Sequence, residues 1–165
     1  MGIKGTQKGT MLSLKNATEK DASPLAVYAI DGGDFVEADG DSVGIGVLNP
    51  MYEWEERLHP GEGKPEQGIC PEDVYGGLQI SGIADVTAEA AISKGDLVKV
   101  GTEKVGDSDG KMVVSAGTFA NLVAGDEPLA VLGLALENSH ATIDGTVIAV
   151  LIMPIVIPAI AAETT

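Results

Sequence analysis

The stretch "PLAVLGLALENSHATIDGTVIAVLIMPIVIP", residues 128–158, is aliphatic on both sides of one polar island and contains no lysine or arginine. Such a run fits either a membrane segment, which needs about 20 apolar residues, or the interior of a folded domain. Pro154 and Pro158 interrupt the run, β-branched residues fill the part before them, and no basic residue flanks it. These features favour core strands over a membrane span.

The first part of this stretch is similar to the hammerhead hairpin of biotinyl and lipoyl domains, in which a glycine-aspartate turn precedes an aliphatic strand. The matching residues are "VAGDEPLAVLGLALE", 123–137. Those families attach their cofactor to a lysine at the hairpin tip, and this chain has no lysine after Lys111. We therefore expect neither a carrier function nor a bound cofactor.

Turn residues divide most of the remaining chain into short aliphatic segments. The 22 glycines cluster with aspartate, as in Asp31-Gly-Gly, Asp39-Gly-Asp, Lys94-Gly-Asp and Asp107-Ser-Asp-Gly. Such pairs supply the positive φ angles that hairpin turns need. Several short strands at this spacing predict an all-β protein with a small barrel or sandwich body.

The positions of the turn residues also suggest four regions along the chain. We expect an extended N-terminal arm over 1–22 and a β-rich region over 23–77, a barrel or sandwich domain over 78–153 and an apolar tail over 154–165. One short helix is predicted at 49–60, with Asn49 as N-cap and Pro50 at the first helical position. The prolines of the tail predict an extended segment that docks on this chain or on a neighbour.

Charge is distributed unevenly. Of the formal net charge of −15, residues 1–20 contribute +3 from four lysines against one glutamate, which leaves −18 for the remainder. The acidic body should repel nucleic acid and anionic membranes. The N-terminal arm with its four lysines is either a solvated tail or a segment that becomes ordered on binding a partner.

The sequence lacks the patterns that support enzyme chemistry. Cys70 is the only cysteine, and His59 and His140 lie in unlike contexts without metal-ligand spacing. The acidic clusters at 39–41 and 107–110 begin like calcium loops, but Val43 and Lys111 occupy the next ligand position. No complete phosphate-binding glycine motif occurs. We expect no catalytic residues, no metal site and no small-molecule substrate.

Residues 82–153 resemble the capsid decoration, or cement, proteins of tailed bacteriophages. The segments that carry the resemblance are "ADVTAEAAISKGDLVKV" and "VLGLALENSHATIDGTVIAVLI", in which Gly-Asp and Asp-Gly turns lead into aliphatic strands. The resemblance implies a β-tulip-like body and a non-enzymatic protein on the outer capsid surface of the virion. Such a protein binds the major capsid protein, often as a homotrimer, without contacting nucleic acid directly.

Under this hypothesis the two chain ends make the subunit contacts. Two other hypotheses remain open: a cellular β-barrel binding module or subunit of a larger soluble complex, and an envelope-associated protein held by the C-terminal apolar run. The residues predicted to contact the capsid or neighbouring subunits are Lys4, Lys8, Leu12, Leu14, Lys15, Lys20, Ile155, Val156, Ile157 and Ile160.

Overall fold

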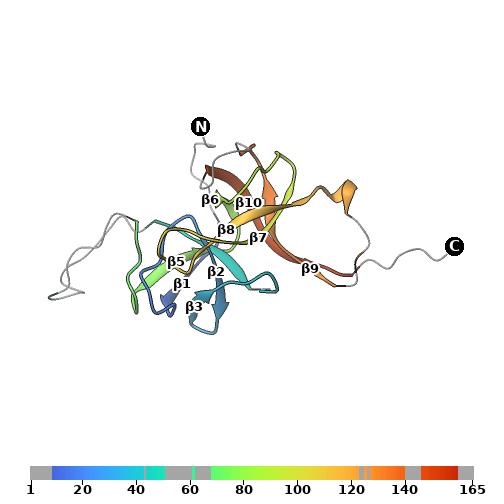
Figure 1. The fold of residues 1–165 in the computed structure, drawn as a ribbon. Helices are drawn as coiled ribbons and strands as arrows, with labels where there is room; N and C mark the ends of the chain where they lie inside the picture. Colours follow the sequence, from blue (N-terminus) through green and yellow to red (C-terminus); the bar gives the residue numbers. More distant parts are fainter. Residues whose placement is uncertain are drawn as a thin grey trace.

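The computed structural model describes residues 9–42, 44–50, 61, 68–122, 125, 127–139 and 146–159. These residues form ten β-strands and one short 3-10 turn, η2, which confirms the predicted all-β class (Figure 1). The helix predicted at 49–60 lies, apart from its first two residues, outside the described residues. The strands are β1 Met11–Asn16, β2 Val27–Asp31, β3 Asp34–Glu37, β4 Ile45–Leu48, β5 Tyr75–Gln79, β6 Gly82–Ala88, β7 Leu97–Lys104, β8 Lys111–Gly117, β9 Leu129–Ala135 and β10 Thr146–Ile157, and η2 is Phe119–Asn121.

The strand pairings close into two rings, which we call the first barrel (β1 to β5) and the second barrel (β6 to β10). Around the first barrel the order is β1-β5-β4-β2-β3, and β3 returns to β1 in parallel. Around the second it is β6-β10-β9-β7-β8, and β8 returns to β6 in parallel. The other neighbours in both rings are antiparallel. The second barrel therefore repeats the strand order and pairing sense of the first.

Each barrel has its own cluster of buried side chains, and strand β2 contributes to both. Ala26 and Tyr28, just before and within β2, lie in the cluster that fills the first barrel. Val27 and Ala29, on the opposite face, lie in the cluster centred on the second barrel. Successive side chains of a strand point to opposite faces. This explains why the segment "LAVYAI" is apolar on both faces, since β2 is the wall between the two cores.

The hairpin between β7 and β8 fixes the second barrel to the first. Its Val105 packs against the core cluster of the first barrel. Gly110 approaches Tyr28 so closely that an added Cβ would lie 2.5 Å from the Tyr28 hydroxyl. The strands join at one point, where Val27 of β2 pairs with Lys111 of β8. The hairpin thus adds to the contact that the two barrels make through β2.

At the N-terminal end the structure differs from the predicted arm. Residues 11–16 form β1, which pairs antiparallel with β5 and parallel with β3. Leu14 is buried and Leu12 is partly buried against the same core. The segment is a wall of the first barrel because Leu12 and Leu14, separated by Ser13, supply an inward face, and two leucines alone give too short a pattern to predict a strand.

At the C-terminal end the last strand extends further than predicted. The expected strand end was Met153, but β10 continues to Ile157 and pairs with β9 along this extension. The register shifts between Ile152 and Ile155, so Pro154 lies at an irregularity of the ladder. A proline fits such a position because no ladder hydrogen bond from its nitrogen is required there.

Candidate interaction surface

The ends of β9 and β10 form a two-stranded extension of the second barrel, which we call the ribbon (residues 129–132 and 153–157). Its three pairs are Ile155 with Val131, Val156 with Ala130 and Ile157 with Leu129. Within the described residues, β7 pairs with β9 only at residues 133 and 134, and β6 pairs with β10 only as far as Ile152. The ribbon therefore has a strand neighbour on one side of each strand only.

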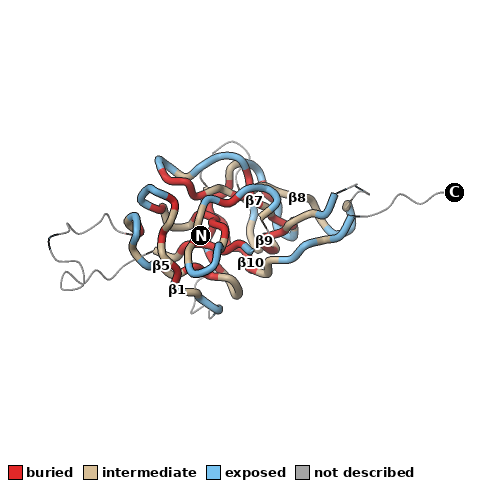
Figure 2. Tube along the Cα trace, turned by 90° about the horizontal axis from the view of Figure 1, so that it is seen from below, coloured by how far each residue is buried: buried red, intermediate tan, exposed pale blue. Residues whose placement is uncertain are grey.

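Apolar side chains of β10 are exposed at its two ends, at Val147 near its start and at Ile155 and Val156 in the ribbon. Ile148 and Val150, in the barrel portion of the strand, are 1% and 0% exposed. Ile155 and Val156 are 40% and 42% exposed. Figure 2 shows the change along the molecule, from buried residues around the two cores to exposed residues toward the C-terminal end. An isoleucine and a valine exposed to this degree side by side make the ribbon a candidate contact surface.

Both faces of the ribbon are apolar. Partners in an antiparallel ladder project to the same face, and consecutive residues project to opposite faces. Val156 and Ala130 therefore share one face, while Ile155 and Ile157 lie on the other with their partners. An ordinary two-stranded ribbon in water has at least one polar face, and a two-stranded unit alone is only marginally stable. Val131 and Leu132 are already buried by this chain, at 1% and 0% exposed, so Ile155 and Val156 are the exposed aliphatic residues of the two faces, one on each.

Two hollows border the ribbon where it approaches the first barrel. Pro154 lines one of about 290 Å³ together with Ile30, Ile45 and Ile80. Val156 lines another of about 280 Å³ with Ala130, Pro128 and Asp41. The apolar surface therefore continues from the ribbon to the side of the first barrel, and Asp41 places a carboxylate at its edge.

The charges around the ribbon are acidic. Asp41 and Glu127 are exposed, and Glu127 directly precedes Pro128 at the start of β9. Four of the described lysines, by contrast, form ion pairs elsewhere. They are Lys15 with Asp73, Lys20 and Lys104 with Asp109, and Lys104 and Lys111 with Glu37.

The predicted contact residues fall into four groups. Ile155, Val156 and Ile157 are brought together on the ribbon, with the first two clearly exposed. Leu14 is only 7% exposed and belongs to the core of the first barrel, so its predicted contact role is corrected to a structural one. Lys4, Lys8 and Ile160 lie outside the described residues.

The remaining three are placed on the first barrel. Leu12 packs partly buried against its core. Lys15 has its Nζ 4.0 Å from Asp73, in a pair whose side chains are largely exposed. Lys20 has its Nζ 3.2 Å from Asp109 and so reaches toward the second barrel. Sequence reasoning missed the β9 side of the ribbon, although the apolar pattern of residues 129–136 on both faces was its signal.

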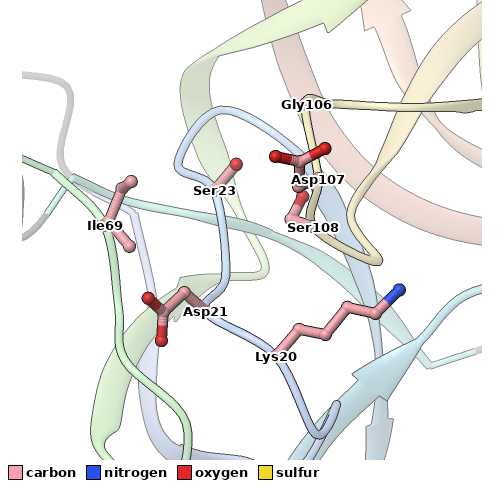
Figure 3. Close-up of a pocket in the computed structure, with 7 residues that line it drawn as sticks. All are labelled: Lys20, Asp21, Ser23, Ile69, Gly106, Asp107 and Ser108. Carbon is pink, nitrogen blue, oxygen red and sulfur yellow. The ribbon is translucent and has the colours of Figure 1, made fainter.

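A hollow of about 500 Å³ lies in the seam between the two barrels (Figure 3). Loop residues of the first barrel line one side and the β7–β8 hairpin lines the other. Two of its polar side chains are bound to protein: Ser108 Oγ donates to the Val105 carbonyl at 2.6 Å, and Asp21 accepts from the Glu72 N–H at 3.3 Å. These bonds indicate a structural seam. The lining residues are Lys20, Asp21, Ser23, Ile69, Gly106, Asp107 and Ser108.

Ion pairs cross the same junction. Lys104 Nζ lies 3.1 Å from Glu37 of the first barrel and 2.9 Å from Asp109 in its own hairpin. Hydrogen bonds from Lys111 and Lys104 lower the pKa of Glu37, and a hydrogen bond from Lys104 is the main cause of a lowered pKa at Asp109. The two carboxylates raise the pKa of Lys104 in turn. The junction is therefore held in its charged form near neutral pH.

Two buried titratable groups are held neutral. Burial raises the pKa of the Cys70 thiol to about 12, and Cys70 Sγ lies 3.4 Å from the Val74 carbonyl. Burial likewise raises the pKa of Tyr28 to about 12, and its hydroxyl donates to the Ser23 carbonyl at 3.3 Å. A thiolate nucleophile needs a lowered pKa and access to solvent. Cys70 is therefore a core residue.

The described residues contain no cluster of three or more histidine, cysteine, aspartate or glutamate side chains arranged to hold a metal ion. Among the same residues, no helix has the length and apolar character needed to cross a bilayer. Comparison of the chain with protein-family models, curated proteins and solved structures found no match. The ribbon is therefore a candidate interaction surface because of its exposure and strand pairing alone.

Proposed function

We propose that the protein is a non-enzymatic virion structural protein that binds the outer surface of an icosahedral phage head. In this function it bridges subunits of the major capsid protein and stabilises the head. The observation that carries the proposal is the ribbon, whose exposed Ile155 and Val156 lie on an extension that is apolar on both faces. The sequence resemblance of residues 82–153 to decoration proteins agrees with it.

Two connected closed barrels are suited to bridging neighbouring capsid subunits. A protein that bridges subunits must resist deformation, and closed barrels expose few free strand edges. The β7–β8 hairpin adds apolar packing through Val105 and ion pairs through Lys104, so the two barrels are held at more than one point. Many copies on one head would then multiply a weak contact through avidity.

The charge favours the outside of the head. With a net charge of −15, the protein would be repelled by packaged nucleic acid and has no basic patch among the described residues to offset this repulsion. Attachment to the outer surface, as a homotrimer or as single copies, avoids that cost. We therefore propose the outer capsid surface as its location and no direct contact with the genome.

Sedimentation of a native lysate from the producing system tests the proposal. The lysate is separated on a sucrose gradient with and without detergent, and an antibody locates the chain. Comigration with DNA-filled particles that detergent does not change is the expected result. Recovery in light soluble fractions would overturn it and favour the cellular binding module, and flotation with membranes would favour envelope association.

The same particles allow a direct binding measurement. Heads lacking the chain are mixed with purified protein, and bound protein is separated by pelleting. Saturable binding at a fixed number of copies per head is expected of a decoration protein. Binding that rises linearly without saturation would mark nonspecific adsorption and count against the proposal.

A further inference from the structure

We infer that the ribbon inserts into an apolar groove on a different protein, and that the rim of this groove is basic. This inference deepens the proposed function by defining the chemistry of the partner, and it rests on that function only for naming the partner as a capsid subunit. The first observation is geometric. Residues on both faces of the ribbon are apolar, as the pairs Ile155 with Val131 and Val156 with Ala130 demonstrate.

A flat partner surface would cover one face of the ribbon and leave the other in water. Ile155 and Val156 point to opposite faces and are exposed to nearly the same degree, 40% and 42%. A groove covers both. Because each side chain is about 40% exposed, burying the remainder contributes about 0.6–1.2 kcal/mol, which corresponds to a factor of roughly 3 to 8 in affinity per residue.

The free edges of the ribbon add a second means of attachment. Residues 129–132 and 153–157 each have a described strand neighbour on one side only. An exposed strand edge can add a strand from another chain through main-chain hydrogen bonds. A groove with a β-strand along one wall would cover both faces of the ribbon and form main-chain hydrogen bonds with its free edge.

Charge complementarity selects the kind of partner. Asp41 and Glu127 are exposed beside the ribbon, and Asp41 lines the same hollow as Val156. Two copies of this chain would bring two net charges of −15 together, with like charges at the contact. A partner whose apolar groove is bordered by lysine or arginine meets both requirements. This argument favours a different protein over a second copy of the chain.

Site-specific photo-crosslinking in the producing cell tests the inference. Val156 on the ribbon is replaced by p-benzoyl-phenylalanine, and Val147, which is 44% exposed near the other end of β10, is replaced in a matched control. Crosslinked peptides are identified by mass spectrometry. A peptide from one other protein that combines apolar residues with lysine or arginine, crosslinked from position 156 and not from 147, is the expected result. A peptide from a second copy of this chain, or equal yields at both positions, would overturn the inference.

Variants supply a quantitative second measurement on heads that lack the chain. The double variant I155S/V156S should bind at least about 10-fold more weakly, and V147S should bind like the unaltered protein. The pair D41N/E127Q should lose about 5- to 20-fold, a loss that shrinks at high salt, whereas D31N, at an exposed site on β2, should not. Thermal unfolding confirms that each variant folds.

The outcomes separate the two proposals. If the unaltered protein binds heads and I155S/V156S binds equally well, the decoration function stands and the ribbon inference fails. If the unaltered protein does not bind heads, the decoration function fails, and the crosslinked peptide at position 156 alone decides the chemistry of the partner.

Discussion

Leu25 and Gly95 occupy the same position in two copies of one turn. Both have a positive φ, 60° at Leu25 and 93° at Gly95. Each donates its N–H to a strand of its own barrel, Leu25 to the Leu48 carbonyl at 2.9 Å and Gly95 to the Ala135 carbonyl at 2.8 Å. The following residue accepts in return, from Leu48 in the first barrel and from Ala135 in the second. The two barrels therefore repeat individual hydrogen bonds as well as strand order.

Other pairings repeat in the same register. Asn16 of β1 pairs with Phe35 of β3, and Ala88 of β6 pairs with Val113 of β8. Directly after these positions, Ala17 donates to the Phe35 carbonyl and Glu89 to the Val113 carbonyl, both at 3.0 Å. The chain is thus a tandem repeat of one five-stranded unit, in which backbone geometry is kept while side chains differ.

The positive φ of Gly95 in this turn predicts that alanine lowers the stability of the protein more at position 95 than at a glycine without a positive φ. In G95A the added methyl meets no atom within 4 Å, so only the positive φ opposes it. We expect a loss of about 1 kcal/mol in the free energy of unfolding, measured by urea denaturation. The control G33A, where the Cβ is also unobstructed and φ is not positive, should stay within about 0.5 kcal/mol of the unaltered protein. Equal losses in both variants would contradict the backbone explanation.

The junction between the barrels predicts a steric effect at Gly110. A Cβ there would lie 2.5 Å from the Cβ of Ala26 and from the hydroxyl of Tyr28, both fully buried. We expect G110A to lower the free energy of unfolding by about 1–3 kcal/mol, because neither neighbour can move without disturbing the core. G40A, where the new Cβ meets nothing, is the matched control. A G110A protein as stable as G40A would show that the hairpin does not dock as described.

The ion pairs at the junction predict a pH dependence. The pKa values of Glu37 and Asp109 are lowered from their ordinary values of 4.5 and 3.8. Their contribution to stability is therefore complete above those values and is lost as the pH falls through the folded-state values. The pKa of Lys104 is raised from 10.5, so its contribution is complete below that pH and is lost as the pH rises through the folded-state value.

The variant K104M isolates this contribution from the general charge of the protein, because methionine keeps much of the apolar side chain. We expect K104M to be less stable than the unaltered protein at pH 7, and the difference in free energy of unfolding to shrink below about pH 4. Urea denaturation at pH 7 and pH 3 measures both. A difference that is the same at the two pH values would exclude the pairs with Glu37 and Asp109 as its cause.

The buried thiol predicts slow modification. Cys70 is fully buried and its pKa is raised to about 12, so the thiolate is scarce at pH 8. Ellman's reagent should react with the native protein at least about 100-fold more slowly than with protein in 6 M guanidinium chloride. Ser139 occupies the corresponding place in the second barrel, where its N–H donates to the Ile92 carbonyl as that of Cys70 donates to Ala22. C70S should therefore fold, and it provides the blank for the assay.

The turns and the strand class could be predicted because their causes are local. Gly32 and Gly95 each supply a positive φ where the sequence indicated a turn. The contact role of the C-terminal end stays a prediction, and the structure shows that Ile155 and Val156 there are partly exposed. Leu14 was assigned to an arm because a six-residue strand with only two alternating leucines has little pattern of its own.

The sequence by itself determined that the chain forms short strands joined by glycine-aspartate turns, with an apolar C-terminal run and an acidic surface. The tertiary structure decided which strands form which barrel, that the second barrel repeats the first, and that β10 passes through Pro154 to form the ribbon with β9. The reason is physical. Turn conformation depends on adjacent residues, whereas the pairing of Val27 with Lys111 or of Ile155 with Val131 depends on contacts between distant segments, which many different aliphatic side chains satisfy equally well.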